Sequence, residues 1–239
     1  MNDRDPIAGP LSTPGNQTVG SLEEQENAIF KPWRERRPDL VADGVVEETR
    51  WLQSRPRLLF LMKEVNDKGG GGWDSREFLL GGARARTWDV VTRWVKGIRA
   101  LPDILPWKPL SLIGVDDRRE ELSTIAHVNL KKSPGGNVTN NEELARASTE
   151  DAMFVSKQLA LYQADLVICC GSVVANLHDD LRPSEFFSSD WGKSTRGVSY
   201  RQINRGGMLI SYSHPEARID KNLLHYGLID AVAELYQAQ

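Results

Sequence analysis

The chain has 239 residues, which fits one large domain with enough length to bury a core. Hydrophobic residues make up 40% of it and charged residues 26%, and no apolar run approaches the roughly 18 residues of a membrane-spanning helix. The formal net charge of -3 disfavours a protein that coats nucleic acid nonspecifically, although it leaves room for a local basic groove. The first residues lack the apolar stretch of a signal peptide, so we expect a cytoplasmic protein and a monomer.

The first half of the chain predicts a tail, a buried strand and a long helix. Residues 1–24 are rich in Gly, Pro, Ser, Thr and Asn, which is typical of a loosely ordered tail, and residues 25–239 then form a single domain. The apolar run 57–62 predicts a strand that is buried on both faces. A glycine-rich loop follows at 69–73, and apolar residues at helical spacing predict an amphipathic helix over 86–100.

The second half alternates strands with helices. Three further strands are predicted at 123–130, 166–170 and 207–212, and the last of them can pair with 198–203. Helices are expected from Asn140 or Ser148 to about Gln163, over 173–181, and over 221–236. This order predicts an α/β fold, with three αβα layers around a central, mainly parallel four-stranded sheet.

Polar or small residues follow each predicted strand, at the edge of the sheet where ligands of open parallel sheets bind. They are Glu64, Asn66 and Asp67, then Asn129, Lys131, Lys132 and Ser133, then Gly171 and Ser172, and last Ser213, His214 and Arg218. Any one of these sets could be an ordinary solvated turn, and their joint occurrence predicts a site. The sequence lacks the motifs of dinucleotide binding, phosphate-binding loops, paired metal ligands and serine nucleophiles.

Three segments resemble the uracil-DNA glycosylase superfamily: FLMKEVND (60–67), VNLKKSPGGN (128–137) and SYSHPEAR (211–218). Their order and spacing are similar to that superfamily's water-activating loop, base-reading Asn strand and His-Pro loop. The segment ADLVICCGSVVANL (164–177) is similar to its third strand and glycine turn. The resemblance covers about residues 55–236.

The resemblance implies a DNA glycosylase that flips a uracil or a modified pyrimidine out of DNA and hydrolyses its N-glycosidic bond, leaving an abasic site. Such an enzyme would act in base-excision repair or in defence against phage DNA with modified cytosines. Val65 stands where several branches place a catalytic Asp or Asn, and Glu216 replaces the usual Ser or Thr after His-Pro. With these departures, a larger or modified base is an alternative to uracil.

No cofactor and no metal ion is expected. Glu64 matches the acid of a branch that carries an iron–sulfur cluster, but the cysteines that would hold a cluster are absent. The chain has two cysteines, Cys169 and Cys170, in an apolar run that predicts buried thiols.

The same resemblance assigns roles at the predicted edge of the sheet. Glu64, with Asn66 and Asp67 as alternatives, would hold the attacking water, and His214 would lie near the leaving base or a flanking phosphate. Asn129 would read the base edge. Val65 and Gly171 would complete the base pocket, and the expected DNA contacts are Lys131, Lys132, Ser133, Ser172, Arg218 and Trp73. The loop that carries Trp73 would close on the site or wedge into the duplex, or the ring would simply pack on the body.

Two other functions remain open on the sequence. A DNA-binding relative that has lost catalysis would fit the altered first loop, and it would bind DNA in a salt-sensitive manner. A hydrolase or transferase of free nucleosides would fit the acidic net charge. A lyase that forms a Schiff base is a further alternative, for which Lys63 is the nearest candidate.

Overall fold

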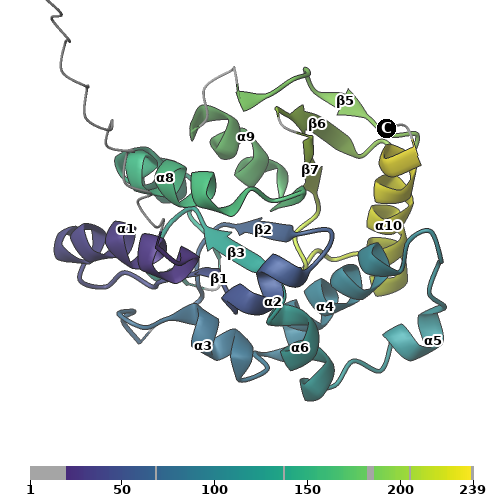
Figure 1. The fold of residues 1–239 in the computed structure, drawn as a ribbon, viewed down its shortest axis with the longest axis horizontal. Coiled ribbons are helices and arrows are strands. Elements are labelled where there is room, and N and C mark those ends of the chain that lie inside the picture. Colours follow the sequence, from purple (N-terminus) through teal and green to yellow (C-terminus); the bar gives the residue numbers. More distant parts are fainter. Residues whose placement is uncertain (1–19, 68, 137, 182–185, 205, 238–239) are drawn as a thin grey trace, which may run out of the picture.

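The computed structural model describes residues 20–67, 69–136, 138–181, 186–204 and 206–237 (Figure 1). Its helices are α1 (Leu22–Arg36), α2 (Glu48–Gln53), α3 (Ser75–Leu80), α4 (Ala85–Ala100), α5 (Trp107–Leu110), α6 (Val115–Leu122), α7 (Asn141–Glu150), α8 (Ala152–Tyr162), α9 (Ser172–Leu181) and α10 (Lys221–Gln237). Its strands are β1 (Gly44–Val45), β2 (Leu58–Met62), β3 (Ala126–Asn129), β4 (Leu166–Cys170), β5 (Gly192–Lys193), β6 (Ser199–Ile203) and β7 (Gly207–Tyr212). Residues 1–19 of the predicted tail lie outside the described residues.

The strands of the described chain form one mixed sheet of seven strands, in the order β1-β3-β2-β4-β7-β6-β5. Its central strands β3, β2, β4 and β7 are parallel to one another, as predicted. The expectation of a four-stranded sheet is wrong, because β1, β6 and β5 extend it with antiparallel pairs. β1 and β5 have two residues each, which is too short for a hydrophobic period to reveal them.

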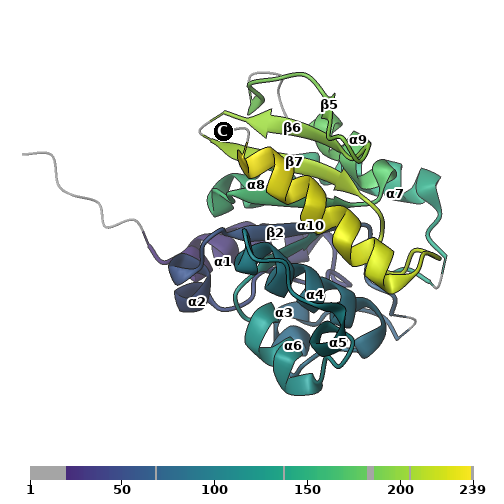
Figure 2. The same cartoon turned by 90° about the vertical axis from the view of Figure 1, so that its right-hand side faces the viewer.

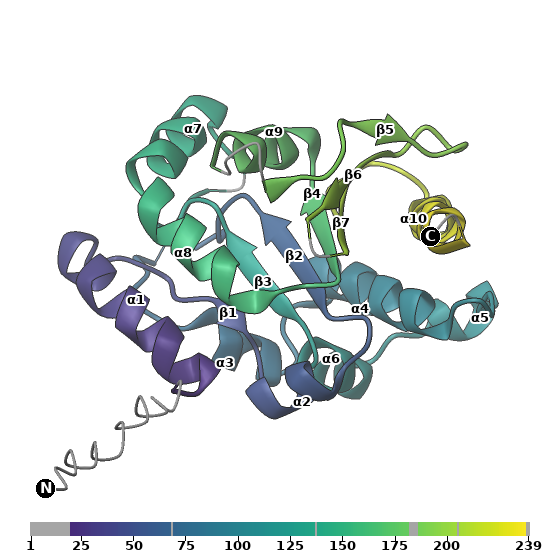
Figure 3. The same ribbon diagram turned by 45° about the horizontal axis from the view of Figure 1, so that its top comes forward.

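Helices cover both faces of the sheet, and each face has its own hydrophobic core (Figure 3). One core joins α1, α8 and α9 to the sheet, and includes Phe30, Val155 and Val174. The other joins α4 and α10 to the sheet, and includes Trp94 and Leu228. Figure 2 shows α10 lying across β7, with α4 beside it. All residues of β2 and β4 are buried, because helices shield the central strands on both sides.

Several helices differ from the sequence prediction. α1 begins inside the predicted tail, and Ser21 and Glu24 form a capping box at its start. The single helix predicted to end near Gln163 is two helices, α7 and α8, that meet at Asp151. The Asp151 carboxylate accepts from the Arg37 guanidinium at 2.5 Å, which ties this junction to the end of α1. No helix of the described residues is long and apolar enough to cross a membrane.

Candidate functional site

A cleft of about 790 Å³ opens beyond the carboxyl ends of β2, β3 and β7. Glu64, Asn129 and His214, which come from three distant stretches of sequence, all line it. Residues of α3 and the start of α4 complete the wall. The lining residues are Met62, Glu64, Val65, Asn66, Asp67, Trp73, Asp74, Ser75, Glu77, Phe78, Arg84, Arg86, Thr87, Trp88, His127, Asn129, Gly136, Thr139, His214 and Glu216.

Backbone hydrogen bonds join the loop after β2 to the loop after β3. The Lys131 N–H donates to the Lys63 carbonyl at 2.9 Å, and the Gly135 N–H donates to the Val65 carbonyl at 2.8 Å. The Asp67 N–H donates back to the Gly135 carbonyl at 3.2 Å. The parallel pairing of the two strands therefore continues into the cleft. It holds the segments that resemble a water-activating loop and a base-reading strand side by side.

Glu64 lies within this paired segment, between Lys63 and Val65. Its side chain is 4% exposed, and its Oε2 lies 2.6 Å from Lys131 Nζ. Gly135 packs directly on the carboxylate, since a Cβ there would lie 2.1 Å from Glu64 Cδ. Lys131 was expected to hold DNA phosphates, but it is buried and its ammonium group is paired with Glu64. The lysine therefore stabilises the charged carboxylate inside the cleft.

His214 is held in one tautomer by the turn that follows it. The Glu216 backbone N–H donates to His214 Nδ1 at 3.1 Å, so the neutral ring carries its proton on Nε2. Burial lowers the pKa of His214 below 6.5, against the opposing effect of the Glu216 charge. Glu216 accepts in turn from Thr87 Oγ1 at 2.5 Å and pairs with Arg86 Nε at 2.7 Å. The ring that lines the cleft is thus a neutral hydrogen-bond donor at neutral pH.

Asn129 is 3% exposed, and the buried carboxylate of Asp43 accepts hydrogen bonds from it. Asp43 Oδ2 accepts from the Asn129 backbone N–H at 2.8 Å and from its Nδ2 at 3.2 Å. Asp43 Oδ1 accepts from Gln158 Nε2 at 2.9 Å and from Lys132 Nζ. Lys132 is fully buried in this network, so the expectation that it contacts DNA phosphates is wrong. A buried ammonium group needs a partner within the protein, and Asp43 is that partner.

Asp67 organises the glycine-rich loop. Its carboxylate accepts from the Gly69 N–H at 2.7 Å, from the Gly71 N–H at 3.2 Å and from Trp73 Nε1 at 2.8 Å. These hydrogen bonds lower the pKa of Asp67, with the bond from Trp73 contributing most. The Trp73 ring also meets Phe78 edge-on, with ring centroids 6.1 Å apart. Trp73 therefore lies in the wall of the cleft, and the Asp67 carboxylate is occupied by hydrogen bonds from the loop.

His127 is a cleft residue that the sequence analysis did not single out. Ser75 Oγ donates to the Ala42 carbonyl at 2.8 Å, so the 2.9 Å contact with His127 Nε2 has the ring as donor. The ring is 1% exposed and lies edge-on to Trp88. Burial lowers the pKa of His127 to about 4, so this ring is neutral at neutral pH. A lone His two residues before Asn129 in a predicted strand was the available signal, because such residues share a face.

Buried neutral His127 makes the stability of the protein fall in acid. The unfolded chain takes up a proton at His127 near pH 6.5, whereas the folded chain resists until about pH 4. Between pH 7 and pH 5 this residue should cost about 2 kcal/mol of unfolding free energy. Urea unfolding at pH 7 and pH 5 gives the loss of unfolding free energy for each protein. This loss should be smaller by about 2 kcal/mol in His127→Gln than in the wild-type protein. Equal decreases in the two proteins would contradict the assignment.

Charges in the cleft are largely compensated. The lining contains the carboxylates of Glu64, Asp67, Asp74, Glu77 and Glu216, and the guanidinium groups of Arg84 and Arg86. Asp74 pairs with Arg76 at 2.6 Å, and its pKa is lowered by that hydrogen bond against the effect of burial. Arg84 and Arg86 are exposed, and Arg84 Nη2 donates to the Asn66 carbonyl at 3.3 Å. The exposed positive charge of the cleft comes from the N-terminal end of α4, where the sequence analysis did not expect it.

Several predicted site residues lie outside the cleft lining. They are Gly171, Ser172, Ser133 and Arg218, together with the buried Lys131 and Lys132. Cys169 and Cys170 are both fully buried, as predicted. They belong to the two opposite cores, so their thiols cannot bind one ion together. Among the described residues no group of three or more His, Cys, Asp and Glu side chains is arranged to hold a metal ion.

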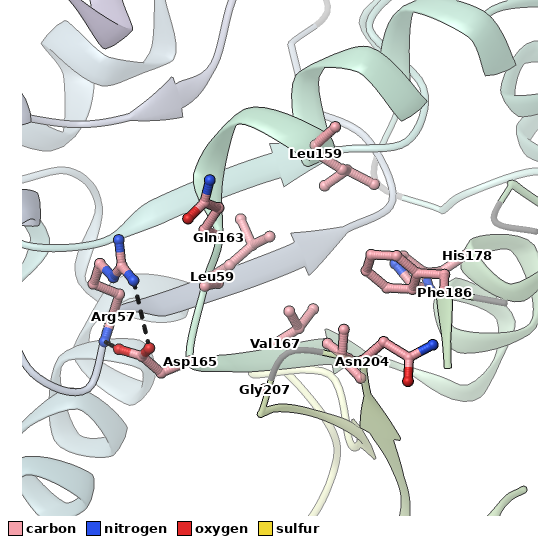
Figure 4. Close-up of a pocket in the computed structure, with 13 residues that line it drawn as sticks. Arg57, Leu59, Leu159, Gln163, Asp165, Val167, His178, Phe186, Asn204 and Gly207 are labelled. Carbon is pink, nitrogen blue, oxygen red and sulfur yellow. Dashed lines mark hydrogen bonds and ion pairs between the residues drawn. The ribbon is translucent and has the colours of Figure 1, made fainter. Parts of the chain in front are cut away.

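A second cavity, of about 450 Å³, lies near the amino ends of β2 and β4 (Figure 4). Apolar side chains, among them Leu59, Leu159 and Val167, form much of its lining. Asp165 accepts from the Arg57 backbone N–H at 2.7 Å and lies 3.6 Å from its guanidinium group. The sequence analysis singled out no residue of this lining, and Arg57 and Asp165 in it form an ion pair with each other. The chemistry is concentrated in the larger cleft.

Asp43, Ser75, Arg84 and Arg86 were missed as residues of the site and its support. The two arginines at the start of the predicted amphipathic helix were a usable signal, because they predict a basic first turn of α4. No local signal pointed to Asp43, because the residue that it hydrogen-bonds, Asn129, lies 86 positions away in the sequence. No model of a known protein family matches this chain, and no curated protein matches it either.

Proposed function

We propose that the protein hydrolyses the N-glycosidic bond of a pyrimidine, uracil or a modified base, that has been flipped out of DNA. One observation carries the proposal: Glu64, Asn129 and His214 line a single cleft at the carboxyl ends of parallel strands. A carboxylate, an amide and a neutral imidazole are the groups that this reaction needs. The order β3-β2-β4-β7 of the parallel strands, within a three-layer arrangement, is compatible with the resemblance to uracil-DNA glycosylases.

The reaction divides naturally between these residues. As the bond from C1′ to the base nitrogen breaks, its electron pair stays with the base and the sugar becomes an oxocarbenium ion. The Glu64 carboxylate, charged beside Lys131, stabilises that cation and accepts a proton from the water that bonds to C1′. The Nε2–H of His214 donates a hydrogen bond to the base as its negative charge develops, and the proton stays on His214. The base leaves as an anion, and the proton that Glu64 took from water returns to it by way of solvent. The net reaction adds one water molecule and gives an abasic sugar and a neutral free base.

Asn129 and the exposed arginines would select and hold the substrate. The Asn129 amide would read the edge of the flipped base, and Arg84 and Arg86, which are exposed at the cleft, would contact phosphates of the strand. The cleft, of about 790 Å³, is large enough for a pyrimidine with or without a substituent.

Hydrolysis of free nucleosides is the second candidate. Burial of Lys131 and Lys132 in ion pairs removes two of the expected phosphate contacts. The cleft lining also has more carboxylates than guanidinium groups, which favours a neutral ligand over a polyanion. The two candidates share the chemistry at C1′. They differ in the substrate, because the sugar is joined to phosphates in DNA and has free hydroxyl groups in a nucleoside.

Mass analysis of released bases tests both candidates. The protein should release one pyrimidine from single-stranded or duplex DNA, and phage DNA with modified cytosines belongs in the panel. Abasic sites should accumulate in the same samples. Turnover of free nucleosides without release from DNA would favour the second candidate. Binding to DNA without release from any substrate would contradict both and support a non-catalytic relative.

A further inference from the structure

We propose that Asp43 is a positioning residue that holds the Asn129 amide with Oδ1 toward the cleft, so that the bound base must present an N–H donor there. The ligand part of this inference rests on the proposed function, because it takes the base to be the group that Asn129 reads. The orientation of the amide does not depend on it.

The buried carboxylate leaves the amide one orientation. Asp43 is fully buried, and its carboxylate accepts hydrogen bonds from N–H donors of Asn129, Gln158 and Lys132. A flipped Asn129 would place Oδ1 against Asp43 Oδ2, and two acceptors at that distance repel each other. The Asn129 backbone N–H donates to the same Oδ2, which fixes the carboxylate relative to the strand. Nδ2 is therefore held toward Asp43.

Oδ1 is then the group that Asn129 offers to a ligand. None of the described residues donates a hydrogen bond to it, and Asn129 lines the cleft. A buried acceptor that binding leaves unpaired is costly, so the site selects ligands with a donor at this place. Cytosine has its 4-amino group and uracil has N3–H. A pyrimidin-2-one nucleoside, in which hydrogen replaces the 4-amino group, has no N–H on that edge and is no larger.

Nuclear magnetic resonance of the Asn129 side-chain amide tests the positioning role without any ligand. In the wild-type protein one Hδ2 proton should exchange slowly with solvent. Asp43→Leu combined with Lys132→Met removes the acceptor without leaving a buried ammonium group unpaired, and it should remove this protection. Lys132→Met alone removes the same cation but leaves the carboxylate its N–H donors from Asn129 and Gln158, so it should keep the protection. Equal protection in both variants, or none in the wild-type protein, would overturn the role of Asp43.

Titration with deoxycytidine, deoxyuridine and the pyrimidin-2-one deoxynucleoside tests the selectivity. The wild-type protein and Lys132→Met should bind the tighter of the first two at least about tenfold better than the third. In the double variant this ratio should fall towards one. If nucleosides bind without discrimination in the wild-type protein, the inference is wrong while the proposed function stands. If none of the three binds as a free nucleoside, single-stranded oligonucleotides that carry the same three bases are titrated instead, and equal affinities there overturn the selectivity. The proposed function is contradicted separately, by the absence of base release from any DNA, and the amide measurement still decides the role of Asp43.

Discussion

Glu64→Gln is expected to lower the single-turnover rate of base release by about 10²- to 10⁴-fold, the range typical of a lost general base. The amide keeps the shape of the side chain, but it cannot take a proton from water and cannot offset positive charge on the sugar. Lys131 would then lie 2.6 Å from a neutral group. The rate should be measured with excess protein on the substrate identified by mass analysis.

Glu143→Gln is the matched control for this change. Glu143 Oε2 lies 3.8 Å from the same lysine, Lys131, but its side chain is 51% exposed and lies outside the cleft lining. Removing this carboxylate should leave the rate of base release unchanged. A Glu64→Gln protein that releases the base at the wild-type rate would show that Glu64 does not activate the water.

Gly135→Ala should lower the same rate by about 10²-fold, as expected for a catalytic group displaced by about 1 Å. The new methyl group would lie 2.1 Å from Glu64 Cδ and 2.4 Å from each carboxylate oxygen, so the side chain must move. The Glu64 carboxylate is buried and paired with Lys131, which leaves it little space to move without losing that pair. The rate of base release and the urea midpoint should be measured together.

Gly136→Ala changes the next residue in the same way without the collision. A Cβ at Gly136 would have no heavy atom within 4 Å, and Gly136 also lines the cleft. This variant should keep both the rate and the stability of the wild-type protein. If the two alanine variants lose activity equally, the loss results from a changed loop backbone and not from displacement of the Glu64 carboxylate.

The central strands could be predicted from local pattern because they are buried on both faces. The run 166–170 has the same bounds in the sequence analysis and in β4. The antiparallel pairing of 198–203 with β7 was also predicted, and it forms β6. α1 has a start signal in the sequence, the capping-box pair Ser21 and Glu24, but Pro32 within it disfavours a continuous helix. What holds α1 is packing of Phe30 and Trp33 against distant elements.

The candidate site was predictable as far as it depends on position along a strand. Residues that directly follow parallel strands share one edge of the sheet, so Glu64, Asn129 and His214 could be expected to meet. Gly171 and Ser172 also follow a parallel strand, yet they lie outside the cleft lining. The lining is completed instead by α3 and the start of α4, whose packing on the sheet no local pattern describes.

The sequence by itself determined the alternation of the four parallel strands with helices, the parallel core of the sheet and the polar ends of its strands. Only the tertiary structure decided what each charged group does there. Lys131 and Lys132 are neighbours of one residue type, yet one pairs with Glu64 in the cleft and the other with Asp43 behind it. The physical reason is that a buried charge is stable only beside its partner. That partner lies 67 positions away for Lys131 and 89 positions away for Lys132.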